Sequence, residues 1–257
     1  MILSRRAALD GVQLDEVHQK VVIRSIDPGI SKQNITAVDR MGGAGQRVTG
    51  EHWSTIDATV TFAINVPKRE MELRRQIFDA VISWAMGGKW LTFNNMPDRR
   101  LYVDKVVLPS SGDLWNWQAE YTITFRAYNV PFWQQAEPVV VKKANITKGS
   151  VVIDVGGTAE SVLDITFKNI SGKEITNFKV TADGKALTLN GVKLGGTETL
   201  TINHGTDGLL RIKAGSRNVY GIYTGDDDLT VKPGKRTVTI EATRAGELTV
   251  TSYGRFF

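Results

Sequence analysis

Residues Ile56 to Val66 alternate between apolar and polar side chains almost without interruption, and no other stretch constrains the fold as strongly. A period of two places successive side chains on opposite faces of an extended chain, so this stretch predicts a half-buried β-strand. Three further segments have the same character, at residues 90–95, 100–109 and 117–128. The first half of the chain is therefore predicted to form a mostly antiparallel sheet.

One helix is predicted to pack on this sheet. After Pro67, apolar residues recur at spacings of three and four, and Gly87-Gly88 supplies a stop. The helix is expected over residues 67–86, with Ile77, Val81 and Trp84 buried. Its charged residues are expected to face water: Lys68, Arg69, Glu70, Arg74 and Arg75.

The distribution of tryptophan indicates two domains. All six tryptophans lie in the first 133 residues, and the remaining 124 residues hold none. The second part instead contains about nine short strand-like segments and turn signals such as Asp183-Gly184, which predict a β-sandwich. We expect a mainly β protein with domains at residues 1–136 and 137–257, joined by a linker near Pro131 to Asn145.

The predicted strand at residues 117–128 ends abruptly. Asn129-Val130-Pro131 interrupts the alternation, Phe132 and Trp133 follow as two aromatics that look exposed, and Pro138 precedes a new apolar run. Proline cannot donate a backbone hydrogen bond and restricts the residue before it. The segment is interpreted as the end of a domain.

The segment from Asp27 to Ser54 is predicted to be a long loop, because it is rich in glycine and polar residues. Loops of this length are usually functional or disordered. Its Gly42-Gly43-Ala44-Gly45 run lacks the Lys-Ser/Thr of a phosphate-binding loop and does not join a strand to a helix. Nucleotide binding is therefore not expected.

Composition narrows the classes of function. The chain has no cysteine, which excludes disulfides and thiolate metal sites. Its net charge of +5 is spread evenly, since residues 1–136 hold 16 basic and 14 acidic residues and residues 137–257 hold 16 and 13. We expect no sequence-specific binding of nucleic acid. A secretion signal and an apolar segment of about 18 residues are both missing, so we expect no membrane insertion.

No catalytic constellation is recognisable in the sequence. The run Asp226-Asp227-Asp228 lacks the spaced ligands of a calcium loop and is expected to be a solvated turn. The chain has no GxSxG motif, and its three histidines are too far apart to form a local metal motif: His18, His52 and His204. We expect no enzymatic activity, no cofactor and no metal.

Carbohydrate binding by the second half is an alternative, because β-sandwiches often bind ligands in a concave face. Sugar sites commonly use an aromatic platform, and this half has no tryptophan. Its Tyr220 and Tyr223 are interpreted as strand residues near a turn.

Segments in both halves resemble one family of phage proteins. EYTITFRAYNVPFWQ is similar to the end of the N-terminal domain in the distal tail (Dit-like) proteins of long-tailed, non-contractile bacteriophages. MGGAGQRVTGEHWSTIDATVTFAI resembles that family's loop and following strand, and VISWAMGGKWLTFNNMPDRRLYV resembles its helix, strand and proline-arginine turn. TGDDDLTVKPGKRTVTI resembles the close of its galectin-like C-terminal domain.

The resemblance implies an N-terminal tail-tube-like domain, an antiparallel sheet or split barrel with one helix, followed by a galectin-like β-sandwich. It implies a structural virion protein, assembled in the host cytoplasm, that forms a homohexameric ring at the distal end of a phage tail. The ring would join the tail tube protein to the tail tip (baseplate) protein, with the tape measure protein as a further partner. The alternatives are a lectin-like module for host attachment and an enzyme of unrecognised type.

Two sets of site residues follow from this expectation. The segment from Asp27 to Ser54 is expected to reach a neighbouring subunit, through Met41, Gly43, Gln46, Arg47 and Trp53. The chain is expected to leave the ring domain through Asn129, Pro131, Phe132 and Trp133.

Overall fold

The computed structural model describes residues 5–39, 44, 46–67, 69–110 and 119–257. The chain divides into two compact units, Met1–Trp133 with Phe257, and Gln134–Phe256. Both are built almost entirely from antiparallel strands, and the predicted fold class, mainly β with one long helix in the first half, is confirmed. No helix in the described part of the chain is long and apolar enough to cross a membrane.

The first unit contains two sheets and, apart from them, a two-stranded ribbon of β4 and β5. One has the strand order β3-β6-β10-β9, and the other contains the strand order β2-β1-β7-β8. The elements are β1 (Ala7–Leu9), β2 (Val12–Gln13), α1 (Leu14–Val17), β3 (Val21–Asp27), β4 (Gln33–Asp39), β5 (Gln46–Trp53), β6 (Ile56–Ile64), α2 (Met71–Gly87), β7 (Trp90–Phe93), β8 (Met96–Tyr102), β9 (Lys105–Val107) and β10 (Glu120–Ala127).

Strand β6 is the alternating stretch of the sequence. Its apolar side chains are buried and its polar ones are partly exposed, and it pairs with β10 over eight residues, from Ile56 opposite Ala127 to Ala63 opposite Glu120. The predicted strand is therefore confirmed.

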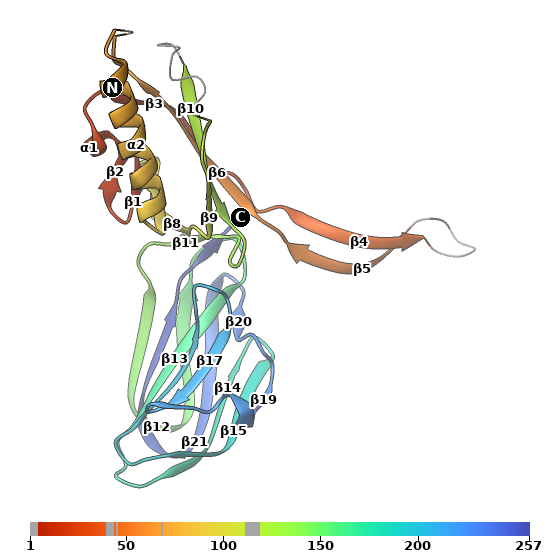
Figure 1. The fold of residues 1–257 in the computed structure, drawn as a ribbon. Coiled ribbons are helices and arrows are strands. Elements are labelled where there is room, and N and C mark those ends of the chain that lie inside the picture. Colours follow the sequence, from red (N-terminus) through yellow and green to blue (C-terminus); the bar gives the residue numbers. More distant parts are fainter. Residues whose placement is uncertain (1–4, 40–43, 45, 68, 111–118) are drawn as a thin grey trace. The chain divides into compact units, whose positions relative to one another are not determined.

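Helix α2 lies beside both sheets of the first unit (Figure 1). The Trp84 ring meets Phe125 of β10 edge-on at 5.9 Å, and its indole N–H donates to the Val12 carbonyl of β2 at 2.9 Å. The predicted burial of Ile77, Val81 and Trp84 is confirmed. The helix begins at Met71, four residues later than predicted, because Pro67 opens a turn that the Glu70 amide closes.

Arg74 is a correction, because it was predicted to face water and is fully buried. It lies three, four and seven residues before Ile77, Phe78 and Val81, so it occupies the same apolar stripe of the helix. No side-chain nitrogen of Arg74 has a hydrogen-bond partner among the residues that the structure describes.

The predicted long loop from Asp27 to Ser54 is also wrong. Most of it forms two strands, β4 and β5, which pair along their length with one irregularity beside Thr36. Glycine and polar residues suggested a loop, but these strands need no buried face, because they are exposed on both sides.

The second unit folds as a bent sheet of long strands. Its elements are β12 (Val139–Val155), β13 (Ser161–Asn169), β14 (Ile175–Ala182), β15 (Lys185–Leu194), β16 (Thr199–His204), β17 (Leu210–Ala214), β18 (Arg217–Asn218), the 3-10 turn η2 (Tyr220–Ile222), β19 (Tyr223–Gly225), β20 (Thr230–Val231), β21 (Gly234–Ser252) and β22 (Arg255–Phe256). Strand β11 (Trp133–Gln135) lies at the division between the units.

Strand β21 belongs to two layers. Residues 246–252 pair with β13, which continues through β16 and β17 to β18, whereas residues 238–242 pair with β14, which continues through β15 to β19. Gly246, at the start of the part that pairs with β13, leaves no room for a side chain, since a Cβ there would lie 2.4 Å from the Phe167 ring. Phe167 of one layer meets Phe178 of the other at 5.1 Å, inside one apolar core.

All nine predicted strand segments of the second half lie in or overlap strands, and two of them, at residues 236–242 and 247–253, merge into β21. The predicted hairpin at Asp183-Gly184 is confirmed, because both residues have positive φ and join the paired residues Ala182 and Lys185. Tyr223 begins a strand as predicted, but Tyr220 lies in η2.

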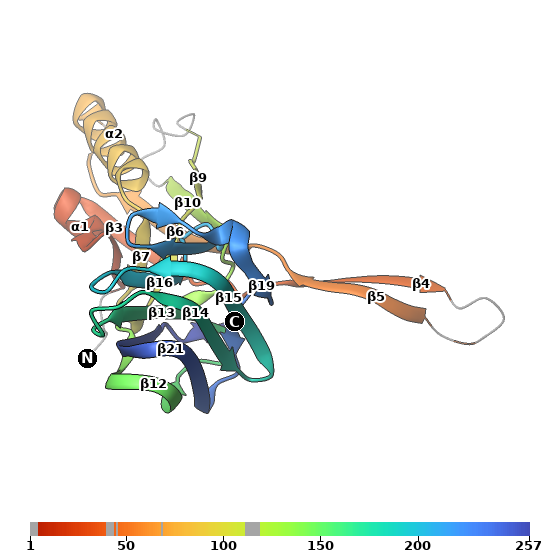
Figure 2. The same ribbon diagram turned by 90° about the horizontal axis from the view of Figure 1, so that it is seen from below.

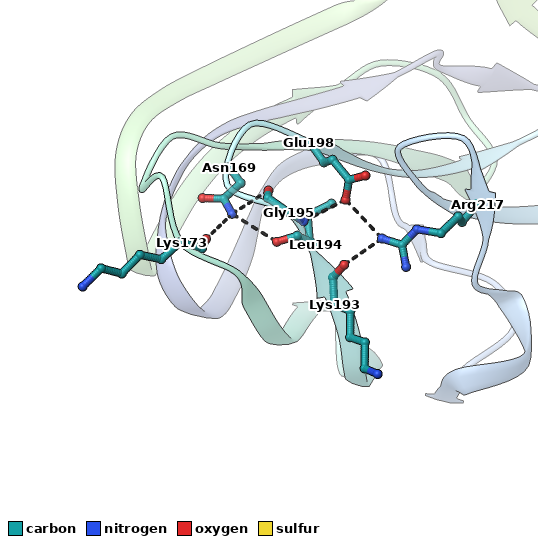
Figure 3. A network of polar contacts seen from close by, with 7 residues as sticks. All are labelled: Asn169, Lys173, Lys193, Leu194, Gly195, Glu198 and Arg217. Carbon is teal, nitrogen blue, oxygen red and sulfur yellow. Dashed lines mark hydrogen bonds and ion pairs between the residues drawn. The ribbon is translucent and has the colours of Figure 1, made fainter.

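A polar network fixes the turns at one end of the second unit (Figure 3). The buried Asn169 amide donates to the carbonyl oxygens of Lys173, Leu194 and Gly195 at 2.7, 3.2 and 2.9 Å. Glu198 accepts from the Gly195 amide at 2.7 Å and from Arg217 at 3.1 Å. These two contacts, the amide first, hold the pKa of Glu198 below its ordinary value.

Candidate assembly surface

Strands β4 and β5 form a two-stranded ribbon, called the arm below, which pairs with no other strand in the described part of the chain. Figures 1 and 2 both show the arm extending away from β6. Residues directly opposite one another share a face of a ribbon, so the register gives the arm two faces. One face gathers the apolar side chains of Ile35, Ala37, Val48 and Trp53, with the polar residues Gln33, Asp39, Gln46 and Glu51 among them, and the other carries Asn34, Thr36, Val38, Arg47, Gly50 and His52.

The first of these faces, called the apolar face below, is exposed. Ile35 is 57% exposed, Val48 50% and Trp53 38%. A two-stranded hairpin alone is only marginally stable in water, and neighbouring exposed apolar side chains mark interaction surfaces. The apolar face is therefore suited to burial against another molecule.

The base of the arm is anchored by aromatic contacts within the first unit. The Trp53 ring lies 6.1 Å from Phe132 and 4.3 Å from Phe257, and Phe132 lies 5.9 Å from Phe257. Ser54 closes the other side, with its amide and hydroxyl donating to the Lys32 carbonyl at 2.7 and 3.0 Å. The base of the arm is therefore fixed against the rest of the first unit.

The segment at Asn129 to Trp133 is bound tightly to the first unit. Asp104 accepts hydrogen bonds from the Tyr128 and Asn129 amides at 2.6 and 3.0 Å and from the Asn129 side chain at 2.7 Å. The Ser31 hydroxyl donates to the Pro131 carbonyl. Strand β10 therefore ends where the main-chain amides of Tyr128 and Asn129 donate to the Asp104 carboxylate and not to a neighbouring strand.

Phe132 and Trp133 are a further correction, because they look exposed in the sequence and are buried. The Trp133 ring lies 5.5 Å from Phe93, and its indole N–H donates to the Pro28 carbonyl at 3.1 Å. The apolar-polar alternation of β10 ends before these residues. Phe132 and Trp133 nevertheless belong to the core of the first unit, where they pack against Trp53 and Phe93.

An ion pair stiffens the strands next to this segment. Arg126 of β10 donates to both carboxylate oxygens of Asp57 on β6, with 2.8 Å between Nη2 and Oδ2. These hydrogen bonds raise the pKa of Arg126. The pair links two central strands and presents no free charge for chemistry.

The structure brings together only part of the predicted interface. Strand β5 begins with Gln46 and Arg47. The side-chain amide of Gln46 donates to the Asp39 carboxylate at 3.1 Å, and Arg47 lies opposite Val38. Trp53 lies at the other end of the same strand. Met41 and Gly43 lie outside the described residues.

Sequence reasoning missed the exposed apolar residues of the arm, above all Ile35 and Val48. A signal was present, because Ile35 and Ala37 alternate with the polar residues Asn34 and Thr36, as in a strand. Ser31, Asp104 and Phe257, which contact these segments, cannot be recognised from the sequence, because each contacts a residue far away along the chain.

In the described part of the chain, no three His, Asp or Glu side chains lie close enough together to hold a metal ion. The predicted exposed turn at Asp226 to Asp228 is confirmed. Its carboxylates bond within the second unit, to the Ala186 amide, the Tyr223 hydroxyl and Lys185.

Comparisons with known proteins identify solved structures that are similar to this one. No family model matches the chain, and no curated protein matches it. The crystal structure of the Dit protein of phage SPP1, described as a paradigm of the hub adsorption apparatus in phages that infect Gram-positive bacteria, is similar over 98% of this chain and 99% of that one, with 15% identity and a TM-score of 0.67. A chain of the activated phage P2 baseplate is similar over 98% of both chains, with 11% identity and a TM-score of 0.47.

The fold of the chain is therefore one found in phage hub proteins. In particular, both units together have the fold of SPP1 Dit. The Dit-like resemblance read from the sequence is confirmed at the level of the fold.

Proposed function

We propose that this chain is a structural subunit of a phage tail, which closes into a ring of six copies at the distal end of the tail. The similarity to a hub protein over both units supports a role in a tail hub. The first unit would form the ring, and the second unit would lie outside it. The ring would join the tail tube protein to the tail tip protein, with the tape measure protein as a further contact, and it would assemble in the host cytoplasm.

The observation that carries this proposal is the arm, with its uncovered apolar face. A closed ring requires two different surfaces on each subunit, so that each copy presents one surface to the copy before it and the other to the copy after it. The arm supplies one such surface, which replaces the loop expected from the sequence. Ile35, Val48 and Trp53 would be its anchors, with Gln46 and Arg47 at its outer end.

The arm provides its own control experiment. Ile35 and Val38 are both half exposed on β4, at 57% and 50%, but they lie on opposite faces. An aspartate at position 35 would lie directly opposite Glu51, so that two like charges would have to be buried together in the ring, which is costly. We expect Ile35→Asp to prevent ring formation and Val38→Asp to leave it intact, as measured by light scattering after size exclusion.

Both variants should melt at the temperature of the parent subunit, because neither side chain is part of a core. Rings formed by Ile35→Asp, or equal loss in both variants, would remove the apolar face from the proposed interface.

A structural role, and not catalysis, is the function that these observations support. The described carboxylates with shifted pKa values are Glu198, Asp207 and Glu241, and each is explained by a hydrogen bond or ion pair within the second unit.

A further inference from the structure

The second unit has a small cavity at the outer edge of β17, far in sequence from the arm. It is open to solvent, has a volume of about 220 Å³ and is lined by Leu210, Arg211, Ile212, Lys213, Asn218 and Tyr220. Strand β18 pairs with β17 only at Lys213 and Ala214. The edge of β17 before Lys213 therefore has no strand partner on this side among the described strands, and η2 forms the facing wall.

Tyr220 is a preorganised aromatic wall. Its side chain is 42% exposed, and its ring packs against Tyr223 at 4.8 Å. The two hydroxyls lie 3.3 Å apart, and the Tyr223 hydroxyl donates to Asp227. The Tyr220 amide donates to the Asn218 side-chain oxygen at 3.0 Å. A ring held in this way loses little conformational freedom when a ligand stacks on it.

Three other residues of the lining are polar, Arg211, Lys213 and Asn218. Asp207 holds Arg211 with hydrogen bonds of 2.9 and 2.6 Å, and Arg211 lowers the pKa of Asp207 to about 2, so both groups are charged at neutral pH. Lys213 is exposed, and no hydrogen bond or ion pair joins its side-chain ammonium to another described residue. The Asn218 amide group adds donors beside the Tyr220 ring.

An aromatic ring beside planar hydrogen-bond donors and a free ammonium suits a ligand with an apolar face, hydroxyl groups and an anionic group. The volume is below the roughly 300 to 1,000 Å³ of sites for drug-sized ligands, which limits the ligand to about one ring. We propose that this cavity binds a phosphorylated hexose, with the sugar ring against Tyr220, its hydroxyls at Asn218 and Arg211, and its phosphate at Lys213.

The test uses the full chain, with saturation-transfer NMR for the sugars and sugar phosphates and, for inorganic phosphate, its competition against a bound sugar phosphate. The probes are glucose 1-phosphate, galactose 1-phosphate and N-acetylglucosamine 1-phosphate, with glucose and inorganic phosphate as the two halves of the ligand. We expect saturable binding of at least one sugar phosphate, with a dissociation constant of about 1 mM, and binding at least about tenfold weaker for each half alone.

Two variants locate the site. Tyr220→Ala and Lys213→Ala should each weaken binding at least about tenfold, because each removes one half of the recognition. Lys168→Ala is the matched control, since Lys168 is an exposed lysine on β13 away from the cavity, and it should change nothing. Tyr220→Phe keeps the ring and should retain binding, which separates loss of stacking from loss of the fold.

The proposal is overturned if none of the three sugar phosphates binds saturably, if Tyr220→Ala or Lys213→Ala binds like the parent, or if inorganic phosphate binds as tightly as the sugar phosphates, which would mean an adventitious ion only. Ring formation is measured separately, so this result and the result for the arm are independent.

Discussion

Single polar side chains fix the main chain at two places where strands end abruptly. Asp104 collects two amides and one side-chain donor after β10, and Asn169 supplies its amide to three carbonyls after β13. A buried carbonyl without a donor costs free energy, so one side chain with several partners stabilises more than an average hydrogen bond. Such residues are difficult to recognise in a sequence, because their partners lie in other turns.

Asn169→Ala tests this at the residue scale. It leaves three carbonyls without this donor, and we expect a loss of about 2 to 4 kcal/mol in the free energy of unfolding. Asn177→Ala is the control, since that exposed side chain accepts only one long hydrogen bond, 3.4 Å from the Gly191 amide. Urea unfolding followed by far-UV circular dichroism measures both, and equal losses would contradict the role assigned to Asn169.

The network also predicts a dependence of stability on pH. The pKa of Glu198 is lowered in the folded chain, so its contribution is complete above its ordinary pKa of 4.5 and is lost as the pH falls through the folded value. Glu198→Gln should therefore lose less stability than the parent between neutral pH and pH values below 4.5. Unfolding curves measured across this range give the difference, and parallel pH profiles would exclude Glu198 as a contributor.

At the scale of elements, helix α2 is the clearest case in which sequence periodicity determines packing. Trp84 contacts both sheets of the first unit, through the Phe125 ring and the Val12 carbonyl. Large aromatic deletions from a core typically cost 3 to 5 kcal/mol. The helix therefore contributes to stability through its buried stripe.

We expect Trp84→Ala to lower the free energy of unfolding of the first unit by about 3 to 5 kcal/mol. Met86→Ala, two residues later on the exposed side of the same helix, should change it by less than about 0.5 kcal/mol. Chemical denaturation of the two variants makes the comparison, and a small loss in Trp84→Ala would show that the stripe contributes little.

The elements also show where sequence reasoning succeeds and where it fails. Strand β6, helix α2 and the strands of the second unit follow from periodicity, because one face of each is buried. The arm has no buried face, so its sequence alternates only weakly between apolar and polar residues. Its glycines then suggested a loop. Arg74 was assigned to the solvent side because it is charged, although its spacing places it on the buried stripe. Two predicted segments merge into β21 through Gly246, where a side chain would clash with the Phe167 ring, and this contact cannot be read from the sequence.

At the scale of the whole molecule, the two units are predicted to unfold separately. All six tryptophans lie in residues 1–133, so intrinsic fluorescence reports on the first unit, whereas circular dichroism reports on both. We expect two transitions in urea, with Trp84→Ala shifting the fluorescent one and Asn169→Ala shifting the other. A single transition that coincides for both probes and shifts with either variant would indicate one cooperative unit.

The proposed ring is the central claim at this scale, and it depends on the arm, whose exposed apolar side chains another copy would cover. Closure also buries ribbon edges that would otherwise invite aggregation.

The most direct test is the mass of the native assembly, measured by light scattering at high protein concentration and in the presence of the tail tube protein. The account predicts a closed particle of about 170 kDa, six times the 28.3 kDa of one chain, with six-fold symmetry in negative-stain images. A chain that stays at 28.3 kDa under both conditions would contradict it.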